Sequence, residues 1–249
     1  RNWFRTIALQ RSAALVVPSL TLEKIAKQVW HQPSEKIYRF PNGVDVHRYE
    51  KKPQRGSFPG FVKRDGEIIV GTIAGLRAVK ILPRLVRAVA AAGPNYRLAI
   101  AGEGPERAEI MAEAQRLGIA DRLMMPGFLK DPARFVGLFD IFALSSDSEQ
   151  YPISLVEAMA AARPVVATNV GDVAAMVSRE NRRFIVARED EASFAAALLE
   201  IGGSVELRTE LAHANYARAL AEYGEAEMLA RYQQLYGATM RRADFARQD

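Results

Sequence analysis

Residues 140–160, DIFALSSDSEQYPISLVEAMA, contain an apolar run, a polar stretch and a second apolar run with helical spacing. Residues 140–144 predict a buried strand, and residues 154–162 predict a helix. The polar residues between them predict a loop that connects the two elements. A short apolar strand followed by a helix is the repeating unit of parallel sheets, which are buried on both faces.

The same unit recurs on both sides of this stretch, and mostly helical sequence follows to the C-terminus. Further strands are predicted at 67–74, 97–101, 122–125, 164–168 and 184–186, and further helices at 81–92, 108–117, 132–139 and 172–178. The alternation predicts an α/β fold, a Rossmann-like parallel sheet with helices on both faces. Such sheets bind ligands where the carboxyl ends of the strands meet helix N-termini.

The sequence before residue 67 follows a different pattern. A strand is predicted at 13–18 and a helix at about 20–30, with Ser19 or Thr21 as its N-cap. A second strand-like run, 36–40, ends at the turn signal Pro41-Asn42-Gly43. Residues 50–66 are rich in lysine, arginine, proline and glycine, and they predict an exposed linker or loop.

Composition excludes several classes of protein. The chain has no cysteine, so disulfides and thiolate metal sites are excluded, and a reducing cytoplasmic location is expected. Its three histidines show no metal-ligand spacing, so no metal is expected. The formal charge of +5 fits either an ordinary solvated surface or attraction to an anion, such as a nucleotide diphosphate or the inner face of a membrane. The basic residues are dispersed, and nucleic acid is not expected as a partner.

The loop at 145–153 carries the most informative polar residues. It leads into a helix N-terminus, where backbone N–H groups and the helix dipole favour an anion such as a diphosphate. Glu149 and Glu157, eight residues apart, can both face one pocket and accept hydrogen bonds from sugar hydroxyls. The alternative is purely structural, because Ser154 and Glu157 also match a capping box.

Two other strand ends carry turns of interest. Arg77 and Lys80 lie between a strand and a helix, where they can hold phosphate oxygens, although an ordinary exposed basic turn has the same composition. The turn Ala101-Gly102-Glu103-Gly104-Pro105 does not match a GxGxxG fingerprint, and Pro105 suits the first turn of a helix. We interpret this third turn as mainly structural.

Taken in order, these segments resemble the C-terminal half of glycosyltransferase family 4, whose members have the GT-B fold of two facing Rossmann-like domains. The resemblance covers about residues 13–240. It is carried by Pro41-Asn-Gly-Val-Asp45, the Arg77/Lys80 turn, Ala101-Gly-Glu-Gly-Pro105, Pro126-Gly-Phe128, Ser146 through Glu149, Glu157-Ala-Met-Ala160 and Pro164-Val-Val-Ala-Thr168.

The resemblance implies transfer of a sugar from a nucleoside-diphosphate sugar, with retention of anomeric configuration and without a metal or other cofactor. The acceptor would be a glycan or a lipid-linked molecule. By analogy, Glu157 would hold the ribose, Glu149 the donor sugar, Arg77 and Lys80 the diphosphate, and the backbone around Tyr151, Pro152, Ile153 and Ser154 the distal phosphate.

The sequence departs from the family pattern at three places. Many members have arginine five residues before the lysine, where this chain has Gly75; Arg77, three residues before Lys80, is the substitute. The usual Glu-Gly-Phe is Glu149-Gln-Tyr-Pro152, and the later Gly-Gly pair is Gly171-Asp172.

The resemblance also predicts the domain organisation. Residues 1–45 are expected to be a remnant of the N-terminal acceptor domain and the crossover, and residues 46–220 the donor-binding domain. Residues 221–249 are expected to form a helix that packs back toward the missing N-terminal domain. A chain of this extent is expected to bind donor weakly and to transfer little sugar. The alternatives are a nucleotide-sugar 2-epimerase and a non-catalytic scaffold or binding subunit.

Overall fold

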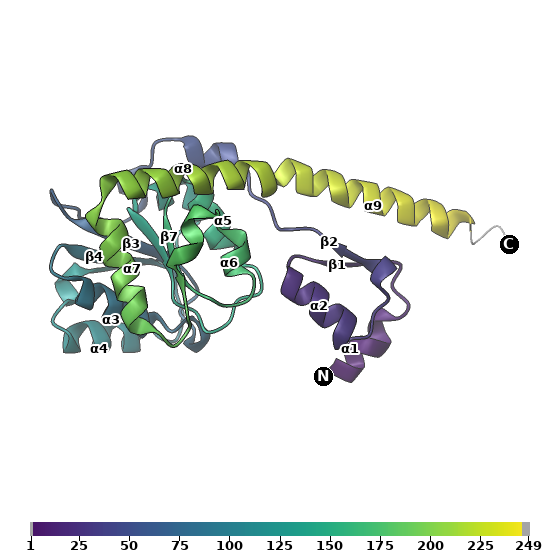
Figure 1. The fold of residues 1–249 in the computed structure, drawn as a ribbon, viewed down its shortest axis with the longest axis horizontal. Coiled ribbons are helices and arrows are strands. Elements are labelled where there is room, and N and C mark those ends of the chain that lie inside the picture. Colours follow the sequence, from purple (N-terminus) through teal and green to yellow (C-terminus); the bar gives the residue numbers. More distant parts are fainter. Residues whose placement is uncertain (1, 246–249) are drawn as a thin grey trace.

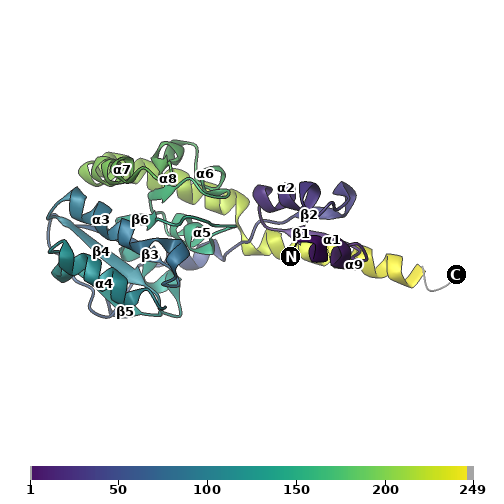
Figure 2. The ribbon, with the colours of Figure 1, turned by 90° about the horizontal axis from the view of Figure 1, so that it is seen from below.

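The structure, a computed structural model, describes residues 2–245. A body of residues 46–223 surrounds a six-stranded sheet, and an N-terminal unit of residues 2–40 surrounds a two-stranded sheet (Figure 1). The helix α9, Glu225–Phe245, leaves the body and runs past the N-terminal unit (Figures 1 and 2). Within residues 2–245, no helix combines the length and apolar character that crossing a bilayer requires.

All strand pairs of the body are parallel, and the strands lie in the order β5-β4-β3-β6-β7-β8. The chain builds outward from β3 on one side and then starts again at β6 on the other side. The predicted parallel sheet is therefore confirmed, and its order reverses between β3 and β6. The strands are β3 (Ile68–Ile73), β4 (Tyr96–Ala101), β5 (Leu123–Gly127), β6 (Ile141–Leu144), β7 (Val165–Thr168) and β8 (Ile185–Val186).

Helices cover both faces of this sheet, as the sequence predicts. On one face, α3 (Leu82–Ala92), α4 (Arg107–Arg116) and α7 (Glu191–Gly203) pack over strand residues that include Val70 and Leu98. On the other face, α5 (Ile153–Ala160) and a cluster of phenylalanines pack over strand residues such as Phe142. Two further helices, α6 (Val173–Met176) and α8 (Val205–Glu222), complete the body. Alternate residues of each strand thus supply two separate cores.

The N-terminal unit contains one βαβ segment and a helix before it. Its elements are α1 (Asn2–Leu9), β1 (Leu15–Val17), α2 (Leu20–Gln28) and β2 (Ile37–Arg39), and β1 pairs with β2 in parallel. Of the two candidate N-caps, Ser19 caps α2, since its side chain accepts a hydrogen bond of 3.1 Å from the Leu22 backbone N–H.

The chain passes between the two parts twice, at residues 40–45 and at the start of α9. The Val44 backbone N–H donates to the Tyr223 carbonyl at 2.9 Å, and the Glu225 N–H donates to the Val44 carbonyl at 3.0 Å. Farther along α9, Tyr232 packs edge-on against Phe40, with 5.1 Å between the ring centroids. The two hydrogen bonds fix the crossover to the start of α9, and the ring contact joins α9 to the N-terminal unit.

One predicted helix is wrong. Residues 132–139 form two separate 3₁₀ turns, Pro132–Arg134 and Val136–Leu138, instead of one α-helix. The backbone of Phe135 (φ −133°, ψ −24°) leaves the helical region and divides the segment. The apolar spacing that predicts a helix is nonetheless used for burial, because Phe135, Val136 and Phe139 all lie in the core.

The expected exposed linker at 50–66 is also partly wrong. Phe58 is fully buried in the body, where its ring lies 5.8 Å from that of Phe135 and 6.0 Å from that of Phe139. A segment with a polar and proline-rich composition therefore supplies one of the largest side chains of the core.

Candidate functional site

The residues singled out by the sequence gather where the strand order reverses. The turn that carries Arg77 and Lys80 follows β3, and the loop that carries Glu149 follows β6, the neighbouring strand. Helices depart in opposite directions from such a point, which leaves a crevice outside the carboxyl ends of the strands. The crevice is therefore a consequence of topology.

An open cavity of about 530 Å³ occupies this crevice. Seven of the eight predicted site residues line it: Arg77, Lys80, Glu149, Tyr151, Pro152, Ile153 and Ser154. They come from two loops that are about 70 residues apart in the chain. The size of this cavity suits a small-molecule ligand.

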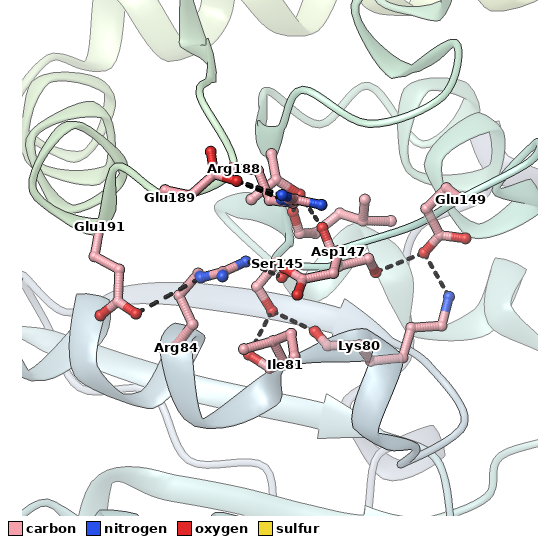
Figure 3. Close-up of polar contacts among 12 residues, drawn as sticks. Lys80, Ile81, Arg84, Ser145, Asp147, Glu149, Arg188, Glu189 and Glu191 are labelled. Atoms are coloured by element: carbon pink, nitrogen blue, oxygen red, sulfur yellow. Dashed lines mark hydrogen bonds and ion pairs between the residues drawn. The ribbon is translucent and has the colours of Figure 1, made fainter.

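Lys80 and Glu149 form an ion pair across the cavity, with 2.5 Å between Nζ and Oε1 (Figure 3). Both side chains are largely buried, and Ser146 Oγ donates a second hydrogen bond of 2.6 Å to the same carboxylate oxygen. The cation and the carboxylate thus compensate each other's charge. A bound anion can accept hydrogen bonds from the Lys80 ammonium in place of Glu149. The Glu149 carboxylate can then accept hydrogen bonds from other donors.

Arg77 lies at the rim of the cavity and is exposed. Its Nε atom is 3.6 Å from the point at which a Cβ on Gly75 would stand. The Arg77 side chain therefore occupies space next to position 75, where the family pattern has arginine.

The helix α5 begins at the cavity. Pro152 is its N-cap residue, and Ile153 and Ser154 are its first helical residues, whose N–H groups lie in the turn that lacks intrahelical acceptors. The capping-box interpretation is wrong. Ser154 lies inside the helix instead of at the cap, and the cap has no side-chain hydrogen bond.

Glu157 does not line the cavity. Its Oε1 atom accepts a hydrogen bond of 3.1 Å from the hydroxyl of Tyr49, a residue 108 positions away in the chain. Burial raises the pKa of Glu157; the Tyr49 hydroxyl opposes this shift, and the charge of Asp131 adds to it. Burial, together with the neighbouring Glu157 carboxylate, also raises the pKa of Tyr49. Glu157 is thus a partly buried carboxylate one turn beyond Ser154 on α5, and its hydrogen-bond donor, Tyr49, is a residue that the sequence analysis does not single out.

The structure adds cavity residues that the sequence analysis does not assign to the site. Gly102 and Glu103 line the cavity from the turn after β4, and Phe128 and Leu129 line it from the segment after β5. A Cβ on Gly102 would stand 1.8 Å from the Ala74 carbonyl oxygen, so only glycine permits the two turns to pack this closely. The third turn is therefore part of the cavity wall as well as structural.

No group of three or more His, Cys, Asp or Glu side chains in the described part of the chain could hold a metal ion. The polar groups of the cavity are instead two cations, carboxylates and the first turn of a helix. This donor set fits an anion flanked by hydroxyl groups.

The family described as "Glycosyl transferases group 1" matches residues 55–218, which include both loops of the cavity. The chain belongs to this family. The resemblance to glycosyltransferases is therefore confirmed, and neither a 2-epimerase nor a scaffold protein is favoured.

Individual relatives agree with this assignment. The chain is 22% identical over 212 residues to N-acetyl-alpha-D-glucosaminyl L-malate synthase of Bacillus anthracis. This match covers 84% of the chain and 56% of the relative. It is 32% identical over 149 residues to 2-deoxystreptamine glucosyltransferase of Streptomyces kanamyceticus. This match covers 56% of the chain and 38% of the relative. The chain thus spans about half the length, or less, of these curated relatives.

Solved structures share the fold. Anabaena HepE, in complex with UDP and glucose, has a TM-score of 0.84 at 19% identity, over 96% of this chain and 68% of HepE. Sucrose-phosphate synthase of Thermosynechococcus elongatus has a TM-score of 0.84 at 21% identity, over 96% of this chain and 61% of the synthase. These similarities confirm the predicted fold class.

Proposed function

We propose that this chain carries the donor-binding half of a glycosyltransferase that moves a sugar from a nucleoside-diphosphate sugar to a glycan or lipid-linked acceptor, with retention of anomeric configuration. The observation that carries the proposal is the single cavity at the strand-order reversal, which brings together Arg77, Lys80, Glu149 and the first turn of α5. The UDP and glucose in the HepE structure support a donor of this class.

Different polar groups of the cavity bind different parts of the nucleotide-sugar donor. Lys80, Arg77 and the first-turn N–H groups of α5 receive the diphosphate, whose charge matches the two cations and the helix dipole. Glu149, once Lys80 turns to the phosphates, accepts hydrogen bonds from sugar hydroxyls. Because the diphosphate is the leaving group, its growing charge is where these cations lower the barrier most.

Glu157 is assigned to the ribose in this proposal. Its carboxylate is partly buried one turn beyond the cavity residue Ser154 on α5, and Tyr49 donates a hydrogen bond to one of its two oxygens. A ribose diol supplies the donors that a buried carboxylate otherwise lacks.

The proposal assigns the other parts of the chain as well. Residues 1–45 belong with an acceptor-binding domain and the crossover, residues 46–220 form the donor domain, and the part of the chain from residue 221 onward, which contains α9, packs against the acceptor side. Because the acceptor half of the cleft is expected mostly outside this chain, we expect the chain by itself to bind donor weakly and to transfer little or no sugar. We also predict that the protein is cytoplasmic and associates peripherally with the inner face of the membrane.

Calorimetric titration of the chain with UDP and with GDP tests the proposal. We expect one of the two to bind, and Lys80→Met to weaken that binding about tenfold to a hundredfold, the range of one charge-assisted hydrogen bond. Arg97→Lys is the matched control, since Arg97 is a buried cation paired with Glu67 at the opposite end of the sheet. A wild-type chain that binds neither nucleotide overturns the proposal.

A further inference from the structure

The residue after Lys80 has an unfavourable backbone. Ile81 adopts the left-handed helical conformation, with φ 43° and ψ 48°. In this region the Cβ of an L-residue crowds the backbone, and a β-branched side chain is an outlier there. Such a conformation persists only where the surroundings hold it, and it is common at functional sites.

A buried serine from the neighbouring loop holds this backbone. Ser145 Oγ lies 2.9 Å from the carbonyl oxygen of Lys80 and 3.2 Å from that of Ile81, so that one hydroxyl donates to both carbonyls. Ser145 is 2% exposed. Its hydroxyl is therefore shielded from water, which strengthens its hold on the two carbonyls.

A buried arginine braces the serine from the other side (Figure 3). Arg84 Nη1 donates to the Ser145 carbonyl at 2.9 Å and to Asp147 Oδ1 at 3.0 Å, while its Nε lies 3.6 Å from Glu191. The Asp147 backbone N–H in turn donates to the Val79 carbonyl at 2.9 Å. Ser145 and Arg84 thus tie the loops after β3 and β6 together.

These ties lie beside the Lys80–Glu149 pair (Figure 3). Lys80 belongs to the strained turn, and Glu149 is four residues beyond Ser145 on the other loop. We propose that Ser145 and Arg84 are positioning residues, which hold Ile81 in its left-handed conformation and thereby aim the Lys80 ammonium into the cavity. The inference rests on the proposed function, because it takes the diphosphate of a nucleotide to be the group that Lys80 meets.

A double-mutant cycle between Ser145→Ala and Ile81→Gly tests this inference, with binding of UDP and of GDP measured by calorimetry. Ser145→Ala removes the hydroxyl, and we expect it to weaken nucleotide binding about fivefold to tenfold, the equivalent of one neutral hydrogen bond. Glycine adopts the left-handed region without strain. In the Ile81→Gly background, we therefore expect Ser145→Ala to weaken binding less than about twofold.

Arg84→Lys tests the role of Arg84 independently, since lysine keeps the charge but loses the guanidinium, whose Nη1 donates to both Ser145 and Asp147 while its Nε faces Glu191. We expect it to weaken nucleotide binding as Ser145→Ala does. The matched controls are Arg97→Lys and Ser178→Ala, two buried residues whose hydrogen bonds lie away from the cavity. Thermal unfolding of all variants separates a general loss of stability from a loss of binding.

The outcomes distinguish the inference from the function on which it rests. If Ser145→Ala and Arg84→Lys lower Tm as the controls do but leave nucleotide affinity unchanged, the two residues are structural only and the inference is overturned. An equal effect of Ser145→Ala with isoleucine and with glycine at position 81 also overturns it, while the donor site stands. If the wild-type chain binds neither UDP nor GDP, the proposed function fails, and the inference fails with it.

Discussion

The body and the N-terminal unit are built from the same βαβ pattern but differ in how much of their apolar surface they bury. The body has a core on each face of its sheet, with side chains such as Phe139 and Leu98 fully buried. The N-terminal unit has only two strands, and its first helix leaves Trp3 75% and Phe4 69% exposed. A two-stranded sheet is marginally stable by itself. We infer that the body determines the stability of the chain and that the N-terminal unit depends on its contacts with the body and α9.

The largest effect is expected from emptying the core of the body. Phe139 is fully buried, and its ring fills the space in front of Gly71, where a Cβ would stand 2.1 Å from it. Phe139→Ala should lower the free energy of unfolding by about 3–5 kcal/mol, the usual range for a buried phenylalanine. Urea unfolding followed by circular dichroism measures this difference. A loss below 1 kcal/mol, roughly that of a surface substitution, would show that the body is not the stability-determining part.

The second effect concerns Glu157, whose ionised carboxylate destabilises the folded body. Burial raises the pKa of Glu157, so the ionised carboxylate is less favourable in the folded chain than in the unfolded chain. Glu157→Gln keeps an acceptor for Tyr49 and removes the charge; we expect Tm at neutral pH to rise. Binding of UDP or GDP should weaken about tenfold to a hundredfold, as expected when a charge-assisted hydrogen bond to the ribose is lost.

The pH dependence of this variant has a definite sign. The folded-state pKa of Glu157 lies above that of the unfolded chain, so the wild type gains stability as the pH falls through the raised value. The advantage of Glu157→Gln should therefore be present at neutral pH and vanish by about pH 4, where glutamate in the unfolded chain is protonated. Thermal scans across this range measure it, and an advantage that grows toward acid would contradict the assigned cause.

The third effect lies at the contact between the two parts. Asp172, on the loop after β7, accepts hydrogen bonds from the backbone N–H groups of Leu20 and Thr21 and from the Thr21 hydroxyl. A carboxylate at the start of α2 stabilises that helix. Asp172→Ala should weaken local protection of α2 by about 1 kcal/mol, the usual contribution of an N-cap side chain.

Hydrogen exchange resolved by segment measures this effect. Faster exchange is expected in α2 but not in β3 or β4, because the core strands of the body do not depend on the contact. Equal acceleration in both regions would show that the N-terminal unit and the body unfold together as one cooperative unit.

The sequence predicted the elements of the body better than its contacts. Each strand of the six-stranded sheet corresponds to an apolar run in the sequence. Both loops of the cavity directly follow such runs, so the sequence could predict that the two loops lie at the same edge of the sheet. The order of the strands has no local signal, and neither has the Tyr49–Glu157 hydrogen bond, whose partners lie 108 positions apart. The left-handed conformation of Ile81 was also missed, because isoleucine gives no indication of positive φ.

The spacing of residues along the sequence was misleading where two different local structures are compatible with the same spacing. Residues 132–139 have helical periodicity, but two 3₁₀ turns bury the same phenylalanines. Ser154 and Glu157 have the spacing of a capping box, but the helix starts two residues earlier than that motif requires, and Glu157 accepts a hydrogen bond from Tyr49. Local patterns therefore predicted which residues are important and not which partners they meet.

The smallest effect is expected at the exposed face of the N-terminal unit. Trp3 is 75% exposed, so its indole is not packed in a core of this chain. Trp3→Ala should change the free energy of unfolding by less than about 0.5 kcal/mol, as surface substitutions do, whereas Phe139→Ala should have several times that effect. Urea unfolding of both variants under the same conditions measures the ratio. A loss at Trp3 as large as that at Phe139 would mean that this face is covered in solution, and that the N-terminal unit is completed by burial against a surface outside residues 2–245.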